Sequence, residues 1–130
     1  MSVETTPVDE VGWQRQWDDA GLFHADLHPD RPKFYCLEMY PYPSGKMHMG
    51  HVRNYSIGDA VARFKRLMGF DVLYPMGFDS FGMPAENAAI SEGGHPHDIT
   101  ERNMASITEQ IKRMGFSYDW RRTLKSHDPR

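Results

Sequence analysis

The sequence contains a single cysteine, Cys36, among 130 residues, so no disulfide can form within the chain. A lone cysteine is typical of proteins that work in a reducing compartment. No apolar run approaches the roughly 20 residues that a helix needs to cross a bilayer. The N-terminal stretch MSVETTPVDE is acidic and lacks the apolar core of a signal peptide. The sequence therefore predicts a cytoplasmic protein that does not associate with a membrane.

An excess of basic residues is also lacking. The chain carries 15 lysines and arginines against 18 acidic residues, a formal net charge of −3. Dedicated polyanion-binding proteins usually show the opposite balance or a strongly basic patch, so the composition does not indicate one, and any nucleic-acid partner would have to be held locally or by other parts of a larger protein. The hydrophobic fraction of 39% is that of an ordinary globular domain with its own core.

Apolar periodicity and turn residues divide the chain into alternating helices and strands. We expect a flexible tail over residues 1–8 and a single folded unit over 9–130. The predicted elements are helix 9–20, strand 33–39 with both faces buried, helix 49–68, strand 70–75, helix 84–92, a helix from a capping box at Asp98 and Glu101 to Gly115, and strand 116–120.

Strands separated by helices predict an α/β fold with a parallel sheet. Ligands of such sheets bind at the carboxyl ends of the strands. The loops at 40–50 and 76–84 both leave predicted strands at that edge. We therefore expect the catalytic and ligand-binding residues in these two loops.

The stretch PYPSGKMHMGH, residues 41–51, places His48 and His51 at the start of the predicted helix 49–68. A helix N-terminus offers backbone N–H groups to an anion, and both imidazoles can donate to the same anion. Gly50 leaves room for a ligand to approach the backbone. A solvated histidine pair and a metal site remain alternatives, although His24, His28 and Cys36 show no zinc-ligand spacing. A Walker-type phosphate loop is excluded, because its motif is absent around Lys46.

Other polar and aromatic residues allow simpler interpretations. Asp79 is a common turn residue, and the aromatic residues Tyr40 and Tyr42 are of the kind that usually fills a core. Glu86 is expected to act only as a helix-end charge. The adjacent pair Arg121 and Arg122 is expected to be solvated.

The motif HMGH at 48–51 resembles the HIGH signature of class I aminoacyl-tRNA synthetases. The longer run from YCLEMYPYPSG through HVRNY and DSFGMPAENAAI resembles the first half of the catalytic domain of the leucyl-tRNA synthetases, and the likeness extends to MGFSYDW. The isoleucyl, valyl and methionyl enzymes share the general pattern and remain alternatives. No KMSKS signature, the second motif of the family, is present.

The resemblance implies specific roles for residues of the two loops. His48 and His51 would be catalytic, and ATP would be bound by His48, Gly50, His51 and Asn54. Leucine would be bound by Met39, Tyr40, Tyr42 and Asp79, with the Asp79 carboxylate meeting the ammonium group. No metal ligands are expected in the protein itself.

The resemblance also implies a fold and an activity. Residues 9–130 would be the N-terminal part of the catalytic domain, the first and incomplete half of a Rossmann-like (HUP-type) doubly wound parallel sheet, truncated at its C-terminus. The parent would be a monomeric leucine–tRNA ligase that uses ATP and Mg²⁺ to form leucyl-adenylate and then acylates tRNA(Leu). The alternatives are an inert fragment that only binds ATP and leucine, and a small adenylyltransferase complete in itself.

Overall fold

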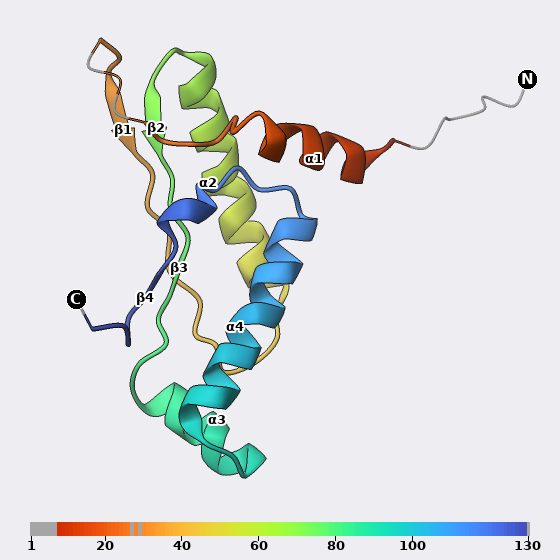
Figure 1. The fold of residues 1–130 in the computed structure, drawn as a ribbon, viewed down its shortest axis with the longest axis vertical. Helices are drawn as coiled ribbons and strands as arrows, with labels where there is room; N and C mark the ends of the chain where they lie inside the picture. The colour runs from red at the N-terminus through yellow and green to blue at the C-terminus, as the bar shows by residue number, and fades with distance from the viewer. Residues whose placement is uncertain (1–7, 27, 29, 130) are drawn as a thin grey trace, which may run out of the picture.

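The computed structural model describes residues 8–26, 28 and 30–129. The predicted tail at 1–8 lies outside these residues, apart from Val8. The elements are α1 (Glu10–Asp19), β1 (Lys33–Tyr35), α2 (Met49–Leu67), β2 (Asp71–Leu73), β3 (Gly77–Phe78), α3 (Met83–Glu92), α4 (Pro96–Arg113), the 3₁₀ turn η1 (Trp120–Arg122) and β4 (Leu124–Lys125) (Figure 1). Within the described part of the chain, no helix is both long and apolar enough to cross a membrane.

The strands form two short parallel pairs, β1 with β2 and β3 with β4. Strands β2 and β3 belong to one extended segment, residues 71–79, which has neighbours on both sides. On one side its backbone bonds to residues 32–41, as in the 2.9 Å bond from Cys36 N to Leu73 O. On the other side Asp119 N donates to Tyr74 O over 2.9 Å, and Ser126 N donates to Phe78 O over 3.0 Å. The predicted α/β fold with parallel strands is confirmed.

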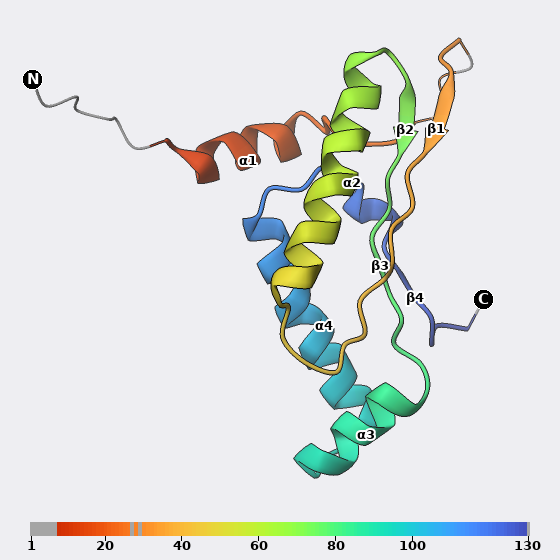
Figure 2. The ribbon, with the colours of Figure 1, turned by 180° about the vertical axis from the view of Figure 1, so that it is seen from behind.

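The two long helices α2 and α4 lie on the same side of the strands, and the two opposite views agree on this (Figures 1 and 2). The main core fills the space between these two helices and the strands. Its most deeply buried side chains are Tyr55 from α2, Tyr74 and Met76 from the extended segment, and Ile107 and Ile111 from α4. The helices therefore brace the strands from one face.

The third strand is not where the sequence predicted it. Residues 116–120 form no strand: Asp119 N bonds to Tyr74 O as a strand residue would, but the N–H of Ser117 donates to the carboxylate of Asp59 over 2.6 Å, so no regular ladder forms. The strand that is present, β4, follows at Leu124–Lys125 and pairs with β3, which falls in a predicted loop.

Strand 33–39 is shorter and less buried than predicted. It ends at Tyr35, and only Cys36 of the apolar run is buried. Tyr35 and Leu37 are more than half exposed, because in the described chain both helices pack on the other face. The prediction that both faces are buried is wrong.

Helix α4 begins earlier than the predicted capping box. His95 is the N-cap, its Nδ1 accepting from the N–H of His97 over 3.3 Å, and Pro96 opens the first turn. Asp98 is therefore an exposed residue within that turn, where its charge suits the helix dipole. Glu101 does not reach back to it but bonds to Lys125.

The limits of α2 match the prediction, and Gly69 follows it with a φ of +87°. The helix buries Tyr55, Asp59 and Ala62. The apolar side chains that predicted it, Ile57, Val61, Phe64 and Met68, are between 41% and 59% exposed. Periodicity thus identified the helix correctly, although these side chains form a second face that nothing covers among the described residues.

Candidate functional site

The loop after β1 and the first turn of α2 enclose a cavity of about 640 Å³. Two hydrogen bonds anchor the loop: Asn103 Nδ2 of α4 donates to Pro43 O over 2.9 Å, and Asp79 N donates to Pro41 O over 3.1 Å. Six of the eight residues that the sequence assigned to ATP and leucine line this cavity, namely Met39, Tyr42, His48, Gly50, His51 and Asn54. The structure brings these six together and leaves Tyr40 and Asp79 outside the lining.

The histidine pair forms the N-terminal cap of α2. His48 is the N-cap residue, and its Nδ1 accepts from the N–H of Gly50 over 3.1 Å. In return, Nδ1 of His51 accepts from the N–H of His48 over 3.2 Å. The sequence therefore places two imidazoles where Ser, Thr or Glu would usually cap a helix.

This capping determines which ring nitrogen carries the proton. An Nδ1 that accepts a hydrogen bond has no proton, so each neutral imidazole carries its proton on Nε2. The two ring centroids lie 4.0 Å apart. Burial, and then the neighbouring His48, lower the pKa of His51, which favours its neutral form. The pair thus offers two Nε2–H donors side by side.

Gly50 is needed for a reason that the sequence did not reveal. We expected it only to leave room for a ligand to approach the backbone. Its N–H instead donates to His48, and a Cβ at this position would lie 2.9 Å from Cε1 of the His48 ring. The glycine makes room for the capping imidazole.

Of the residues assigned to leucine, Met39 and Tyr42 line the cavity, and each is more than half exposed. Tyr40 packs partly buried against the core, beside Gly77, where a Cβ would come within 2.6 Å of its ring. Asp79 lies at the end of β3, and its Oδ1 accepts from the Ser126 hydroxyl over 3.3 Å. Through its backbone bond to Pro41, Asp79 is tied directly to the loop that forms the cavity.

Tyr55 supports both walls of the cavity from beneath. It is fully buried, its hydroxyl donates to Met39 O over 3.1 Å, and its ring lies 5.9 Å from that of His51. Burial, and then Glu38, raise the pKa of Tyr55 to about 12, so it stays a donor. One side chain therefore links the Met39 side of the cavity to the histidine side.

Glu38 anchors the strand just before this point. Its Oε2 accepts from the hydroxyls of Tyr74 at 2.7 Å and Tyr118 at 2.5 Å. Burial raises the pKa of the Glu38 carboxyl, against the two tyrosine hydrogen bonds, which lower it. The sequence analysis missed this network, although a glutamate inside the apolar run YCLEM was a signal for it.

Three further expectations concern charged residues outside the cavity. Glu86 is an exposed charge in the first turn of α3, as predicted. Arg121 and Arg122 were expected to be solvated, which is wrong in part. Both are about half exposed, yet both pair with the buried Asp119 carboxylate at 3.0 and 3.4 Å.

Comparison with known proteins places this geometry in a family. Residues 36–129 match the family model described as tRNA synthetases class I (M). A leucine–tRNA ligase of Nitratidesulfovibrio vulgaris (strain DSM 19637 / Miyazaki F) is 61% identical over 120 residues, which are 92% of this chain and 14% of the relative.

Two solved structures are similar in fold. The LeuRS of Agrobacterium radiobacter K84, in a ternary complex with tRNA and LeuAMS, matches 92% of this chain and 15% of its own with a TM-score of 0.88 at 46% identity. The methionyl-tRNA synthetase of Mycobacterium tuberculosis, bound by methionyl-adenylate, matches 74% of this chain and 19% of its own with a TM-score of 0.69 at 30% identity. The chain thus spans about one seventh of the length of its leucine-specific relatives.

Proposed function

This chain belongs to the class I tRNA synthetase family, and on that premise we propose that it forms the leucine- and ATP-binding half of the active site of a leucine–tRNA ligase. The observation that carries the proposal is the shared cavity. Six assigned residues from the loop after β1 and the first two turns of α2 line it, and the helix cap already orients the histidine pair there.

On the ATP side, His48 and His51 would donate from Nε2 to phosphate oxygens. In the reaction, a leucine carboxylate oxygen attacks the α-phosphorus in line. The bond from that phosphorus to the β-phosphate oxygen breaks, and pyrophosphate leaves with the electron pair. Donors fixed beforehand stabilise the charge that develops on the phosphate oxygens. Asn54, one turn further along α2, lines the same cavity and would contact the nucleotide.

Mg²⁺ would enter with the ATP phosphates as part of the substrate. The described residues that line the cavity include no aspartate or glutamate, and their oxygen donors are hydroxyl, amide and carbonyl groups. A cation that prefers carboxylates and phosphates is therefore better served by the nucleotide than by this chain.

On the leucine side, Met39 and Tyr42 would supply the apolar wall and Tyr40 its support. The Asp79 carboxylate would receive the ammonium group, which needs an opposite charge once it leaves water. Since Asp79 bonds to Ser126 in the structure, ligand binding would exchange this neutral partner for the charged one.

The proposal includes the rest of the enzyme. Three parallel segments with helices on one side fit the first half of a doubly wound Rossmann-like sheet. The remaining chain of the relatives would supply the other half, including the KMSKS lysines, and the tRNA(Leu) contacts. The complete enzyme would act as a monomer in the cytoplasm.

An exchange of segments tests this proposal. The present chain replaces the matching segment of the Nitratidesulfovibrio vulgaris leucine–tRNA ligase, and exchange of labelled pyrophosphate into ATP is measured with leucine, methionine, isoleucine and valine. We expect exchange that requires leucine. Preference for methionine or another amino acid would overturn the leucine assignment.

Two variants of the hybrid enzyme assign the roles. Asp79→Asn should raise the KM for leucine far more than the KM for ATP, because the amide keeps the shape but loses the charge. His51→Ala should lower kcat by about 10- to 1,000-fold. Equal effects of Asp79→Asn on both substrates would show that the ammonium contact is wrongly placed.

A hybrid that folds but catalyses no exchange would favour the alternative function, an inert segment that only binds ATP and leucine. The exposed strand face and the exposed face of α2 show that much of this chain's surface has no cover of its own, which is the observation in favour of that alternative.

A further inference from the structure

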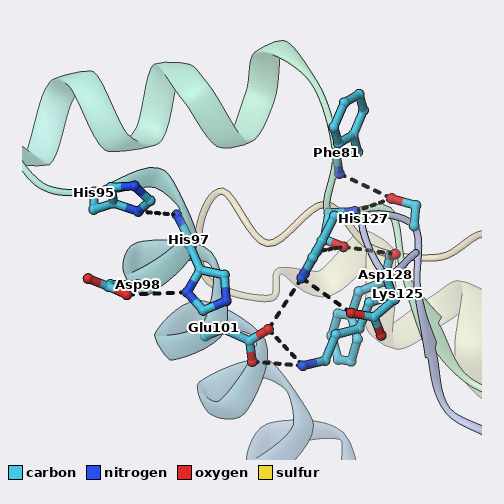
Figure 3. A network of polar contacts seen from close by, with 11 residues as sticks. Phe81, His95, His97, Asp98, Glu101, Lys125, His127 and Asp128 are labelled. Atoms are coloured by element: carbon cyan, nitrogen blue, oxygen red, sulfur yellow. Dashed lines mark hydrogen bonds and ion pairs between the residues drawn. The ribbon is translucent and has the colours of Figure 1, made fainter.

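A second cluster of chemically reactive side chains lies away from the cavity, between the start of α4 and the segment after β4. His97, Glu101 and His127 each offer a ligand atom within 4.8 Å of the other two. His97 and Glu101 are four residues apart on α4 and so lie on the same helix face, while His127 approaches from the segment after β4 (Figure 3). The geometry points to a Zn²⁺ site with these three residues as protein ligands.

The spacing already fits a tetrahedral ion in part. Nitrogen and oxygen donors about 2.0–2.1 Å from a tetrahedral zinc lie about 3.3–3.4 Å from each other. His127 Nε2 and Glu101 Oε1 are 3.4 Å apart. The His97 ring must move closer. Its side chain is 62% exposed, and its Nδ1, which lies 3.2 Å from Asp98 Oδ1, would leave that carboxylate for the ion.

The set of donors selects the kind of metal. Two imidazoles and one carboxylate suit zinc, which binds three protein ligands and keeps a fourth position for water. Asp128 is a further carboxylate nearby, with Oδ1 3.7 Å from His127 Nε2. The imidazole edge of His127 thus faces two carboxylates, a surrounding that favours a cation.

The orientation of His127 is fixed by a second contact. Its Nδ1 lies 2.7 Å from the hydroxyl of Ser80, which is only 5% exposed. When Nδ1–H donates to this hydroxyl, Nε2 is left with a lone pair that points toward Glu101. Zinc-binding histidines are commonly held in this way through the nitrogen that does not bind the metal.

Lys125 competes with the metal for Glu101. Its Nζ donates to Oε1 at 2.7 Å and to Oε2 at 2.8 Å. On metal binding, Oε1 would turn to the ion while Lys125 keeps Oε2.

The site would join three segments that are distant in sequence. It links α4 to the chain after β4, and through Ser80 to the residues after β3. Ser126, next to His127, bonds to Asp79 and to the N–H groups of Ser80 and Phe81. If the proposed function holds, the ion would thereby restrict the movement of Asp79, which meets the leucine ammonium group.

Metal titration of the chain tests the inference without any assay of activity. The metal-free protein is titrated with Zn²⁺ against a chromophoric chelator, and with Co²⁺ to record the visible absorption of a four-coordinate ion. We expect one bound ion and a rise of Tm on binding. His97→Ala and His127→Ala should each weaken binding by more than about 10-fold.

Two further variants separate a metal site from a simple ion-pair network. Ser80→Ala should weaken zinc binding by about 10-fold, because the His127 ring loses its orientation. Lys125→Met should tighten binding, because the carboxylate loses its competing cation. A network of ion pairs alone would show no zinc binding in either protein, and that result would overturn the inference.

Matched histidine controls locate the ion. His95→Asn keeps the helix cap and removes a neighbouring imidazole, so zinc binding should be unchanged. Loss of binding in a His48→Asn, His51→Asn double variant, with binding intact in His127→Ala, would place the ion at the other histidine pair and overturn the assignment. His97→Ala removes an exposed side chain, so this variant remains informative if His127→Ala does not fold.

Discussion

At the scale of single residues, the histidines at 48 and 51 cap α2 with one ring nitrogen, and we propose that they bind the nucleotide with the other. Nδ1 of each ring caps α2, which leaves Nε2–H for a ligand. In this proposal each side chain has a structural role and a chemical role, and the capping bond to Nδ1 leaves the proton on Nε2, where the proposed chemistry needs it. A substitution that preserves one task and removes the other can separate them.

His48→Asn and His48→Ala make this separation. Asparagine is a good N-cap residue and would keep the bond to the Gly50 N–H, whereas alanine would lose it at a cost of about 1 kcal/mol. Neither side chain reaches as far as Nε2. We expect urea unfolding to show a stability loss for alanine alone, while both variants, placed in the hybrid ligase, slow adenylate formation by about 10- to 1,000-fold.

Near-normal adenylate formation by His48→Asn would contradict this account, because it would mean that the Nε2–H donor is not used. Equal stability of the two variants would show that the capping bond contributes nothing measurable.

At the scale of elements, the connection between β1 and α2 depends on one partly buried carboxylate, that of Glu38. Glu38 accepts from Tyr74 and Tyr118, and burial raises its pKa above the ordinary value of 4.5. Because its pKa is higher in the folded than in the unfolded chain, the folded chain binds more protons between the two values. This contribution to stability is fully present below 4.5 and is lost as the pH rises through the folded pKa.

Glu38→Gln tests this at constant shape. The amide oxygen can accept both tyrosine hydrogen bonds but has no proton to lose. We expect urea unfolding over a pH series to show that the wild type loses stability relative to the variant as the pH rises above 4.5. Parallel pH profiles for the two proteins would mean that the Glu38 carboxyl has the same pKa in both states.

Gly58 on α2 leaves the space that the Glu38 carboxylate occupies. A Cβ at this position would lie 1.7 Å from Glu38 Oε1, so Gly58→Ala must displace the carboxylate. We expect a stability loss of about 1–3 kcal/mol, typical of overpacking. Gly45→Ala is the control, because a Cβ there has no neighbour within 4 Å among the described atoms. Equal stability of Gly58→Ala and Gly45→Ala would show that Glu38 can move without loss.

Elements that depend on local sequence were predictable, and those that depend on distant partners were not. Helix α2 and its end at Gly69 were predicted closely, because apolar spacing and a left-handed glycine are local signals. Strand β4 was missed because it is two residues long and exists only through its pairing with β3. The His48 cap was missed because imidazoles rarely perform that role, and nothing in the spacing shows which nitrogen accepts.

The residues of the candidate site also fall into those that the sequence indicated and those that only the structure revealed. The resemblance assigned eight residues to the ligands, and six of them line one cavity in the structure. It did not indicate Tyr55 and Glu38, which support that cavity from the core. Their roles arise from contacts between α2, the strands and the segment 116–120, and no single stretch of sequence contains all of these.

At the scale of the whole molecule, the described chain has helices on one side of its strands and uncovered apolar surface elsewhere. Leu37 and Met39 are 57% and 66% exposed on the strand side, and Phe64 and Leu67 on α2 are 59% and 87% exposed. Apolar groups gathered in this way favour association. The chain is therefore expected to self-associate in isolation.

Phe64→Glu and Leu67→Glu should reduce this association while leaving the helix content unchanged, because both side chains are exposed and glutamate is a good helix former. Sedimentation velocity over a range of concentrations would show the change, and circular dichroism would check the fold. Leu22→Glu, an equally apolar exposed residue outside α2, is the control. If the α2 variants left the association unchanged, the exposed face of α2 would not be the surface through which the chains associate.

The most direct test of the central claim, that the cavity beside the histidine pair is the leucine and ATP half-site of a ligase, is a calorimetric titration of the chain with LeuAMS. The wild type should bind it, methionine and its adenylate analogue should compete poorly, and His48→Asn and Asp79→Asn should each weaken binding with the fold intact. Binding that both variants leave unchanged would place the ligand elsewhere and contradict the account.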